Sequence, residues 1–266
     1  MTLLPDSTRF LPDQSEAARA ADYPYAAPEG AFVLNQGALH HFDDAAVLRG
    51  RTAVLSVGSN RAPVQLRRKF GDAAVVPVTP AILHDCDIVH NAAISYYGAV
   101  SCTAFPSKGT DVLLNVAWLD EDQLAIMHTT EAVGIAYDFI RFFNGIVGHL
   151  PVLAAGGDIV AAAQPVYGYA SRSGVLDAGG GQPAGLAAIG VRRRRFQTLS
   201  QASAAALVKA RTGAPPDIPT EGFIAGIVAD PSARQELNRT LADTALHADG
   251  PWQIQTVTSE AARQYL

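Results

Sequence analysis

The order of the apolar segments constrains the fold of this chain more than any other feature of its sequence. Between residues 52 and 118, runs rich in β-branched and aromatic residues follow one another with one helix-like segment among them. Strands and helices do not alternate regularly, so the sequence predicts a mixed α+β fold rather than a doubly wound one. We expect strands at 52–56, 87–95, 100–105, 111–118, 135–143, 165–171 and 183–191, and helices at 61–70, 120–130, 201–211, 220–229 and 231–247.

The chain shows no internal repeat and no long linker that would divide it into separate domains. Its 266 residues, 48% of them hydrophobic, are enough for one sizeable core. The glycine-rich segment Asp177–Pro183 is interpreted as a hairpin loop between two apolar runs. We expect an N-terminal extension at 1–50 that wraps the core, a core domain at 51–212, and a C-terminal helical extension at 213–266.

Charge and cysteine content narrow the class of partner. The formal net charge is −5, so no global basic field attracts nucleic acid or an anionic membrane. The basic run Arg192–Arg195 favours a solvated turn or a salt-bridged edge in such a protein. Cys86 and Cys102 are too few for a disulfide framework and lack the paired spacing of a zinc site. We expect a small-molecule partner and no nucleic acid; the sequence does not predict an oligomeric state.

We expect a cytoplasmic protein, because the sequence shows neither a secretory leader nor a membrane span. The first residues combine neither a basic leader nor an uninterrupted apolar core, so we expect no secretory signal. The longest apolar-looking region, Val152–Ala170, is interrupted by Asp158, Gln164 and Pro165. Such interruptions do not fit a membrane span.

The turn Val57–Asn60 is the first candidate site. It joins the expected strand at 52–56 to the helix at 61–70, and Gly58 leaves room for a ligand near the backbone. Amides from Gly58 through the first helical turn would lie at the positive end of the helix dipole, where they can bind a carboxylate or an oxyanion. The alternative is an ordinary connection in which Asn60 caps the helix. Neither a G-x-G-x-x-G nor a P-loop pattern follows the strand.

Glu131 is the second candidate. It follows the helix at 120–130, which Asp120 and Gln123 are expected to begin with a capping box. The negative end of the helix dipole disfavours an ionised carboxylate there, a setting that suits a general base. The alternative is a solvated surface glutamate.

Other candidate residues carry weaker signals. Ser59 lacks the second glycine of a nucleophile elbow. His84, Cys86 and His90 would share one face of a strand, but we do not expect a metal site there. Hydroxyl groups that can face a pocket come from Tyr96, Tyr97, Tyr167 and Tyr169.

Four segments occur in an order that resembles the γ-glutamylcyclotransferase-like superfamily. They are Val57–Asn60, Pro106–Val112, Leu119–Leu124 and Glu131, and the resemblance covers roughly residues 52–211. It implies a small mixed β-barrel with flanking helices. Val57 stands where the family typically has a tyrosine, which removes one hydroxyl, and Ala132 stands where a glycine is common.

The resemblance also implies a reaction. In the family, the α-amine of the substrate attacks its own γ-amide carbonyl, which gives 5-oxoproline and a free amine. Here Glu131 would be the general acid and base, while Val57, Gly58, Ser59, Asn60 and Tyr169 would contact a substrate carrying a carboxylate and an amide. No metal or cofactor is required. The alternatives are an amide hydrolase on the same scaffold and a non-catalytic module that binds a carboxylated ligand.

Overall fold

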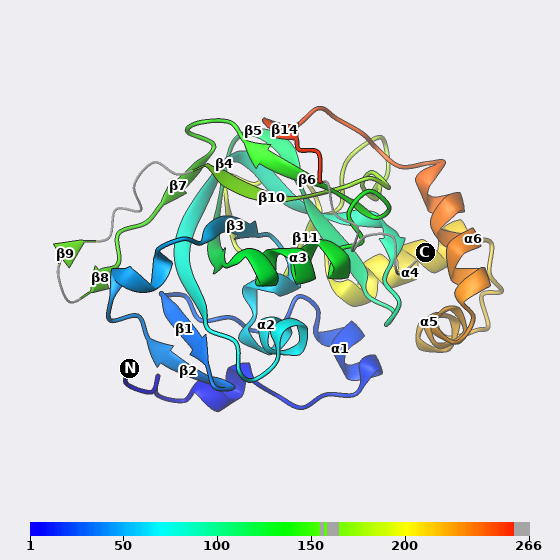
Figure 1. Ribbon diagram of the computed structural model, residues 1–266. Helices are drawn as coiled ribbons and strands as arrows, with labels where there is room; N and C mark the ends of the chain where they lie inside the picture. Colours follow the sequence, from blue (N-terminus) through cyan, green and yellow to red (C-terminus); the bar gives the residue numbers. More distant parts are fainter. Residues whose placement is uncertain (155–156, 159–164, 258–266) are drawn as a thin grey trace.

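Two long antiparallel strands organise the protein. The computed structural model describes residues 1–154, 157–158 and 165–257, and Figure 1 shows its arrangement. Strands β4 (Val76–Ile94) and β5 (Val100–Leu119) form a hairpin in which Ala81 lies opposite Leu114. A register shift between His84 and Cys86 lets the ladder continue, so β5 spans both strands that were expected at 100–105 and 111–118.

The other strands extend this hairpin into one mixed sheet of twelve strands. The main path is β13-β11-β4-β5-β3-β10-β6-β14, in which β3 and β10 are parallel. It does not close on itself among the described residues, so the strand pairing does not form the expected small barrel. The strands on the path, besides β4 and β5, are β3 (Thr52–Ser56), β6 (Tyr137–Phe142), β10 (Val166–Ser171), β11 (Gly185–Leu186), β13 (Thr198–Leu199) and β14 (Trp252–Ile254).

Within the described ranges, short strands and six α-helices complete a mixed α+β fold, as the sequence predicted. Off the path lie β1 (Phe32–Asn35), β2 (Ala38–His41), β7 (Val147–His149) and β12 (Val191–Arg192), and a separate pair is formed by β8 (Leu153–Ala154) and β9 (Gly157–Asp158). The helices are α1 (Glu16–Asp22), α2 (Pro63–Phe70), α3 (Glu121–Thr130), α4 (Gln201–Arg211), α5 (Thr220–Ala229) and α6 (Pro231–Ala242). Single 3₁₀ turns occur at η1 (Ser7–Phe10), η2 (Ala45–Leu48) and η3 (Ser59–Arg61).

Both ends of the chain join the same sheet. Strand β1 pairs with β4, and β14 pairs with β6. Figure 1 shows α4, α5 and α6 together at one end of the sheet, with α2 and α3 near its centre. No helix of the described residues combines the length and the apolar character that crossing a membrane requires.

Apolar packing places α2 beside α3. Leu66 of α2 and Met127 of α3 are fully buried in one cluster with Phe32 and Leu119 of the sheet. Burying such side chains contributes about 1.5–3 kcal/mol each. This cluster therefore holds the last turn of α2 against the end of α3, which decides the geometry of the candidate site.

Most predicted elements are confirmed, and the exceptions have physical causes. The helix at 120–130 has the expected capping box, and α4 and α5 begin and end at the predicted residues. The expected strand at 183–191 is wrong: only Gly185–Leu186 pairs, before Val191–Arg192 joins a different neighbour. Helix α6 ends at Ala242, before the predicted residue 247. Asp177 accepts hydrogen bonds from Gly179 and Gln182 in the expected hairpin loop. The apolar region 152–170 lies partly outside the described residues.

Candidate functional site

The turn after β3 differs from the expected cap. Asn60 does not begin a helix; residues 59–61 form η3, and α2 starts only at Pro63. The cause is Ala62, whose φ of −89° and ψ of 132° are those of a residue held extended by the following proline. The side chain of Asn60 is therefore free of the capping role and donates instead to Glu131 Oε1, at 3.0 Å.

Three backbone N–H groups of the turn have no hydrogen-bond acceptor among the described residues. The first backbone hydrogen bonds of η3 run from Arg61 N to Gly58 O and from Ala62 N to Ser59 O. The amides of Gly58, Ser59 and Asn60 donate to no described residue. Three successive amides without a protein acceptor are chemically suited to an anion.

Glu131 lies at the C-terminal end of α3, as expected, but it is not a solvated surface residue. Its side chain is 15% exposed, and Oε1 accepts from Lys69 Nζ as well as from Asn60. The Lys69 side chain is 6% exposed, and its Nζ also lies 3.2 Å from the sulfur of Met127. The two opposite charges therefore form a largely buried ion pair.

Lys69 is a residue that sequence reasoning missed. It is one of three basic residues in the last turn of α2, where cations are generally favourable. Arg67 on the same turn pairs with the exposed Asp72 instead. Only the packing of α2 against α3 selects Lys69 as the partner of Glu131.

A buried tyrosine, Tyr169, and a partly buried one, Tyr137, lie near the Glu131 carboxylate. Burial and then the charge of Glu131 raise the pKa of both Tyr137 and Tyr169. Tyr169, expected to contact a substrate, places its hydroxyl 2.9 Å from His128 Nδ1. The Tyr137 hydroxyl donates to Ser101 Oγ, at 3.2 Å. Both phenols are neutral and hydrogen-bonded within the protein.

Tyr23, from the N-terminal region, packs beside Gly58 of the turn. It is buried, and its hydroxyl accepts from the Cys102 backbone N–H at 3.1 Å and faces Cys102 Sγ at 3.2 Å. A Cβ added to Gly58 would lie 2.5 Å from the Tyr23 hydroxyl oxygen and 2.8 Å from Cys102 Sγ. No local sequence pattern placed Tyr23 beside the turn, because the contact joins residues far apart in the chain.

Cys102 and Val57 form the inner wall of the same region. Burial raises the pKa of the Cys102 thiol to about 12, so the group stays protonated at neutral pH and does not act as a thiolate nucleophile. Its Sγ donates to the carbonyl of Val57, at 3.6 Å. The Val57 side chain packs against the main apolar core. Beside them, burial lowers the pKa of Arg61, and its Nε has no described partner.

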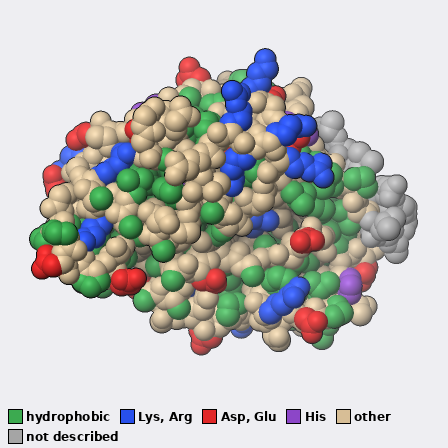
Figure 2. Space-filling view, turned by 180° about the vertical axis from the view of Figure 1, so that it is seen from behind, with side chains coloured by type: hydrophobic (Ala, Val, Ile, Leu, Met, Phe, Trp, Pro, Cys, Tyr) green, Lys and Arg blue, Asp and Glu red, His purple; other side chains and the backbone are tan. Residues whose placement is uncertain are grey.

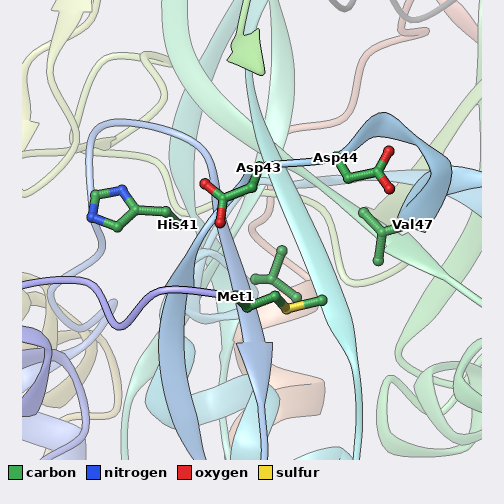
Figure 3. A pocket seen from close by; sticks show the side chains of 6 residues that line it. Met1, His41, Asp43, Asp44 and Val47 are labelled. Atoms are coloured by element: carbon green, nitrogen blue, oxygen red, sulfur yellow. The ribbon is translucent and has the colours of Figure 1, made fainter. Parts of the chain in front are cut away.

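The cavity in Figure 3 lies elsewhere. Its volume is about 280 Å³, and Met1, His41, Asp43, Asp44 and Val47 surround it. It contains none of the residues of the turn or of α3. The candidate site is therefore described by its hydrogen bonds and by the packing of Tyr23 and Cys102 beside Gly58.

The two histidines that the sequence analysis considered as metal ligands have polar neighbours in the protein. His84 Nδ1 lies 2.7 Å from Asp111, and the two nitrogens of His90 face the carbonyls of Val100 and Leu199. In the parts of the chain that the structure describes, no three His, Cys, Asp or Glu side chains form a group that could hold a metal ion.

The basic run is a salt-bridged edge. Arg194 donates to the fully buried Asp87, and Arg193 pairs with Asp111. Figure 2 shows Lys and Arg side chains in the upper part of the back face, with Asp and Glu side chains spread around them.

Comparisons of the chain with protein-family models, with curated proteins and with solved structures give no match. Its function is therefore argued from the geometry of the site.

Proposed function

We propose that this protein cleaves a γ-glutamyl amide by intramolecular attack of the α-amine, releasing 5-oxoproline and an amine. The observation that carries the proposal is the contact between Glu131 and Asn60. It joins a largely buried carboxylate to a turn with three available amides, 71 residues apart in the chain. The proposal includes a γ-glutamylcyclotransferase-like core at residues 51–212, flanked by the N- and C-terminal extensions.

In this proposal Glu131 moves the proton. Both of its described donors, Asn60 and Lys69, reach Oε1, which leaves Oε2 for the substrate. The carboxylate takes a proton from the substrate ammonium, the freed amine forms a bond to the γ-carbonyl carbon, and the amide C–N bond breaks. That proton goes to the departing amine, and the second proton, which the ring nitrogen loses as it becomes the lactam N–H, converts the released amine to its ammonium form.

The turn would bind the negative charge of the substrate, and the substrate itself supplies the nucleophile. The amides of Gly58, Ser59 and Asn60 would bind the substrate carboxylate or the oxyanion. Because the nucleophile belongs to the substrate itself, correct folding of that molecule accounts for much of the rate; effective molarities of such reactions reach roughly 10⁵ M or more. Tyr169 would form part of the wall, through its bond to His128.

A non-catalytic binding module is the second candidate. Val57 favours it, because it stands where the family typically has a tyrosine and removes one hydroxyl from the turn. In that case the Lys69–Glu131 pair would serve the packing of α2 on α3. An amide hydrolase, in which Glu131 activates water, remains the third alternative.

Product analysis separates the three candidates. The protein would be incubated with γ-glutamyl amides of amino acids, peptides and polyamines, and the products identified by mass spectrometry. 5-Oxoproline indicates cyclisation, free glutamate indicates hydrolysis, and neither product from any amide favours the binding module.

Glu131→Gln tests the role of the carboxylate. We expect turnover to fall by roughly 10²-fold or more, because the amide cannot take up the proton. Glu121→Gln, an exposed glutamate at the start of the same helix, is the matched control. Unchanged turnover in a folded Glu131→Gln protein would remove Glu131 from the mechanism.

A further inference from the structure

The four arginines at 192–195 divide into one structural residue and three surface charges. The guanidinium of Arg194 makes three hydrogen bonds with the fully buried carboxylate of Asp87. These bonds fix the segment on the sheet and neutralise one of its charges. The other members of the run are exposed, namely Arg192, Arg193 and Arg195. Three positive charges therefore stay at the surface of a short, anchored segment.

Strand β5 brings a lysine to the same place. Its residues 107–110 have no partner in β4, because the register of the two strands shifts there. This excursion is held by its backbone: the Gly109 N–H donates to Asp85, and the Gly109 carbonyl accepts from Arg193 Nε, each at 2.7 Å. Lys108 precedes that glycine and is exposed. The lysine is thus carried on a hydrogen-bonded loop beside the arginines.

The four cations that gather here are called the basic patch: Lys108, Arg192, Arg193 and Arg195. Two carboxylates lie among them, Asp85 and Asp111. Asp111 is already shared, since it pairs with Arg193 and lies 2.7 Å from His84 Nδ1. Among the described residues, no carboxylate lies within ion-pair distance of the other three cations. The patch is therefore locally positive, although the formal net charge of the chain is −5.

An exposed leucine adjoins the basic patch. Leu113 is 47% exposed and follows Asp111 by two residues on β5, so both side chains lie on the same face of the sheet. Ile82, which is opposite Leu113 on β4, is half-buried. The surface thus combines unpaired cations with an aliphatic contact.

This combination fits an acidic polypeptide better than a nucleic acid. Single-stranded nucleic acids bind by stacking bases on accessible aromatic side chains. The rings of Phe105 and Phe196 beside the run are half-buried and pack edge-to-face on each other, with centroids 6.1 Å apart. A long polyanion would also meet the excess negative charge of the remaining surface. A short segment would feel mainly the patch, because charges farther than about 8–10 Å are screened at physiological salt.

We propose that the basic patch and Leu113 dock a short acidic segment of another protein. Aspartate or glutamate side chains of that segment pair with the cations, and an aliphatic side chain packs on Leu113. The hydrogen bonds of Arg194 and Gly109 hold the backbone of this surface in place before binding, which lowers the entropy cost of association. The interaction is independent of amide cleavage and of Glu131.

Fluorescence anisotropy with a labelled peptide tests the role of the cations. The probe is a fluorescein-labelled peptide of aspartate and glutamate residues around one leucine, added to the intact chain. We expect the triple variant Lys108→Gln/Arg192→Gln/Arg195→Gln to bind at least about tenfold more weakly than the wild type. Raising the salt from about 0.05 M to 0.5 M should also weaken wild-type binding several-fold. The three residues are exposed and have no described ion-pair partner, so the variant should unfold at the wild-type temperature.

A matched variant removes the same charge elsewhere. Arg9→Gln/Arg49→Gln/Arg141→Gln changes three exposed cations outside the basic patch. Its affinity for the peptide should stay within about twofold of the wild type, because distant surface charges are screened. Equal weakening in the two triple variants, or no salt-sensitive binding of the peptide to the wild type, would overturn the proposal.

Leu113→Gln tests the aliphatic contact. We expect it to weaken binding of the leucine peptide at least about threefold and to leave binding of a glutamine-substituted peptide unchanged, since the coupling requires both apolar groups. An equal effect on the two peptides would contradict that contact.

Two further outcomes would assign the surface to another partner. Tighter binding of a single-stranded oligonucleotide of the same charge would identify a nucleic-acid site. A salt-sensitive dimer in sedimentation, lost in the variant of the basic patch, would identify a second copy of the chain. Either result would overturn the proposed acidic segment.

Discussion

At the scale of single residues, the pairing of Lys69 with Glu131 is the most consequential contact. Both side chains are largely removed from water, so each charge depends on the other for stabilisation. Asn60 adds a neutral donor to the same carboxylate oxygen. The pair therefore joins α2, α3 and the turn into one unit, whether or not the carboxylate moves a proton.

Removing the lysine charge should destabilise the fold. For Lys69→Met we expect a loss of about 3–5 kcal/mol at pH 7, because a buried carboxylate remains without its counter-charge. Urea denaturation of the variant and the wild type at pH 7 measures this loss.

Arg67→Met is the control for that experiment. Arg67 belongs to the same helix turn, but its partner Asp72 has a side chain that is 64% exposed. Surface pairs of this kind contribute about 0–1 kcal/mol. A Lys69→Met loss no larger than that of Arg67→Met would contradict the importance of the buried pair.

At the scale of elements, the connection from β3 to α2 is the decisive one. Its path follows from Pro63, which keeps Ala62 out of the helix, and from Gly58, which admits Tyr23 and Cys102. This connection brings together Tyr23 of the N-terminal segment, Cys102 of β5 and Glu131 at the end of α3. A side chain at position 58 would separate them.

Gly58→Ala tests that close approach. The added methyl would lie 2.5 Å from the Tyr23 hydroxyl and 2.8 Å from Cys102 Sγ, so one of these groups must move. We expect a loss of about 1–3 kcal/mol in the free energy of unfolding and faster amide hydrogen exchange in α1. Gly190→Ala is the control, because nothing lies within 4 Å of its Cβ position. Equal stability of the two variants would show that Tyr23 and Cys102 adjust to the methyl group without cost.

At the scale of the whole molecule, one sheet includes strands from both ends of the chain. Strand β1 belongs to the first fifty residues and β14 to the last fifty-four, and each pairs with a strand of the central region. The extensions expected from the sequence are thus hydrogen-bonded parts of the sheet. The same fold buries several histidines.

These histidines predict a loss of stability in acid. Burial lowers the pKa of His90, His128 and His149 below the ordinary value of 6.5. The unfolded chain therefore binds protons that the folded protein does not, once the pH falls below about 6.5. Their contribution is fully present above that pH and is lost progressively as the pH falls toward the folded-state values.

Chemical denaturation between pH 7.5 and 5 measures this dependence. We expect the unfolding free energy to decrease below pH 6.5, and His128→Gln to show a smaller decrease than the wild type. A His128→Gln protein with the wild-type slope would contradict a contribution from His128.

Local patterns predicted much of the fold. The strand at 52–56, the capping box of α3 and the limits of α4 and α5 depend on neighbouring residues, and all are confirmed. The first half of β4, from Val76, was missed because it depends on pairing with β1 and β5. The prediction of one strand at 183–191 was wrong for the same reason, because Gly185 pairs with β4 whereas Val191 pairs with β5.

For the candidate site, the sequence by itself determined the chemical groups: a glycine turn after a strand, an asparagine beside it, and a glutamate at the end of a capped helix. Local propensity and spacing are enough to place each of them on its own element. Only the tertiary structure decided that Asn60 and Lys69 share the Glu131 carboxylate and that Tyr23 packs beside Gly58. Those contacts depend on the packing of α2 on α3 and on the path of the N-terminal segment, and such long-range burial leaves no periodic signal in the sequence.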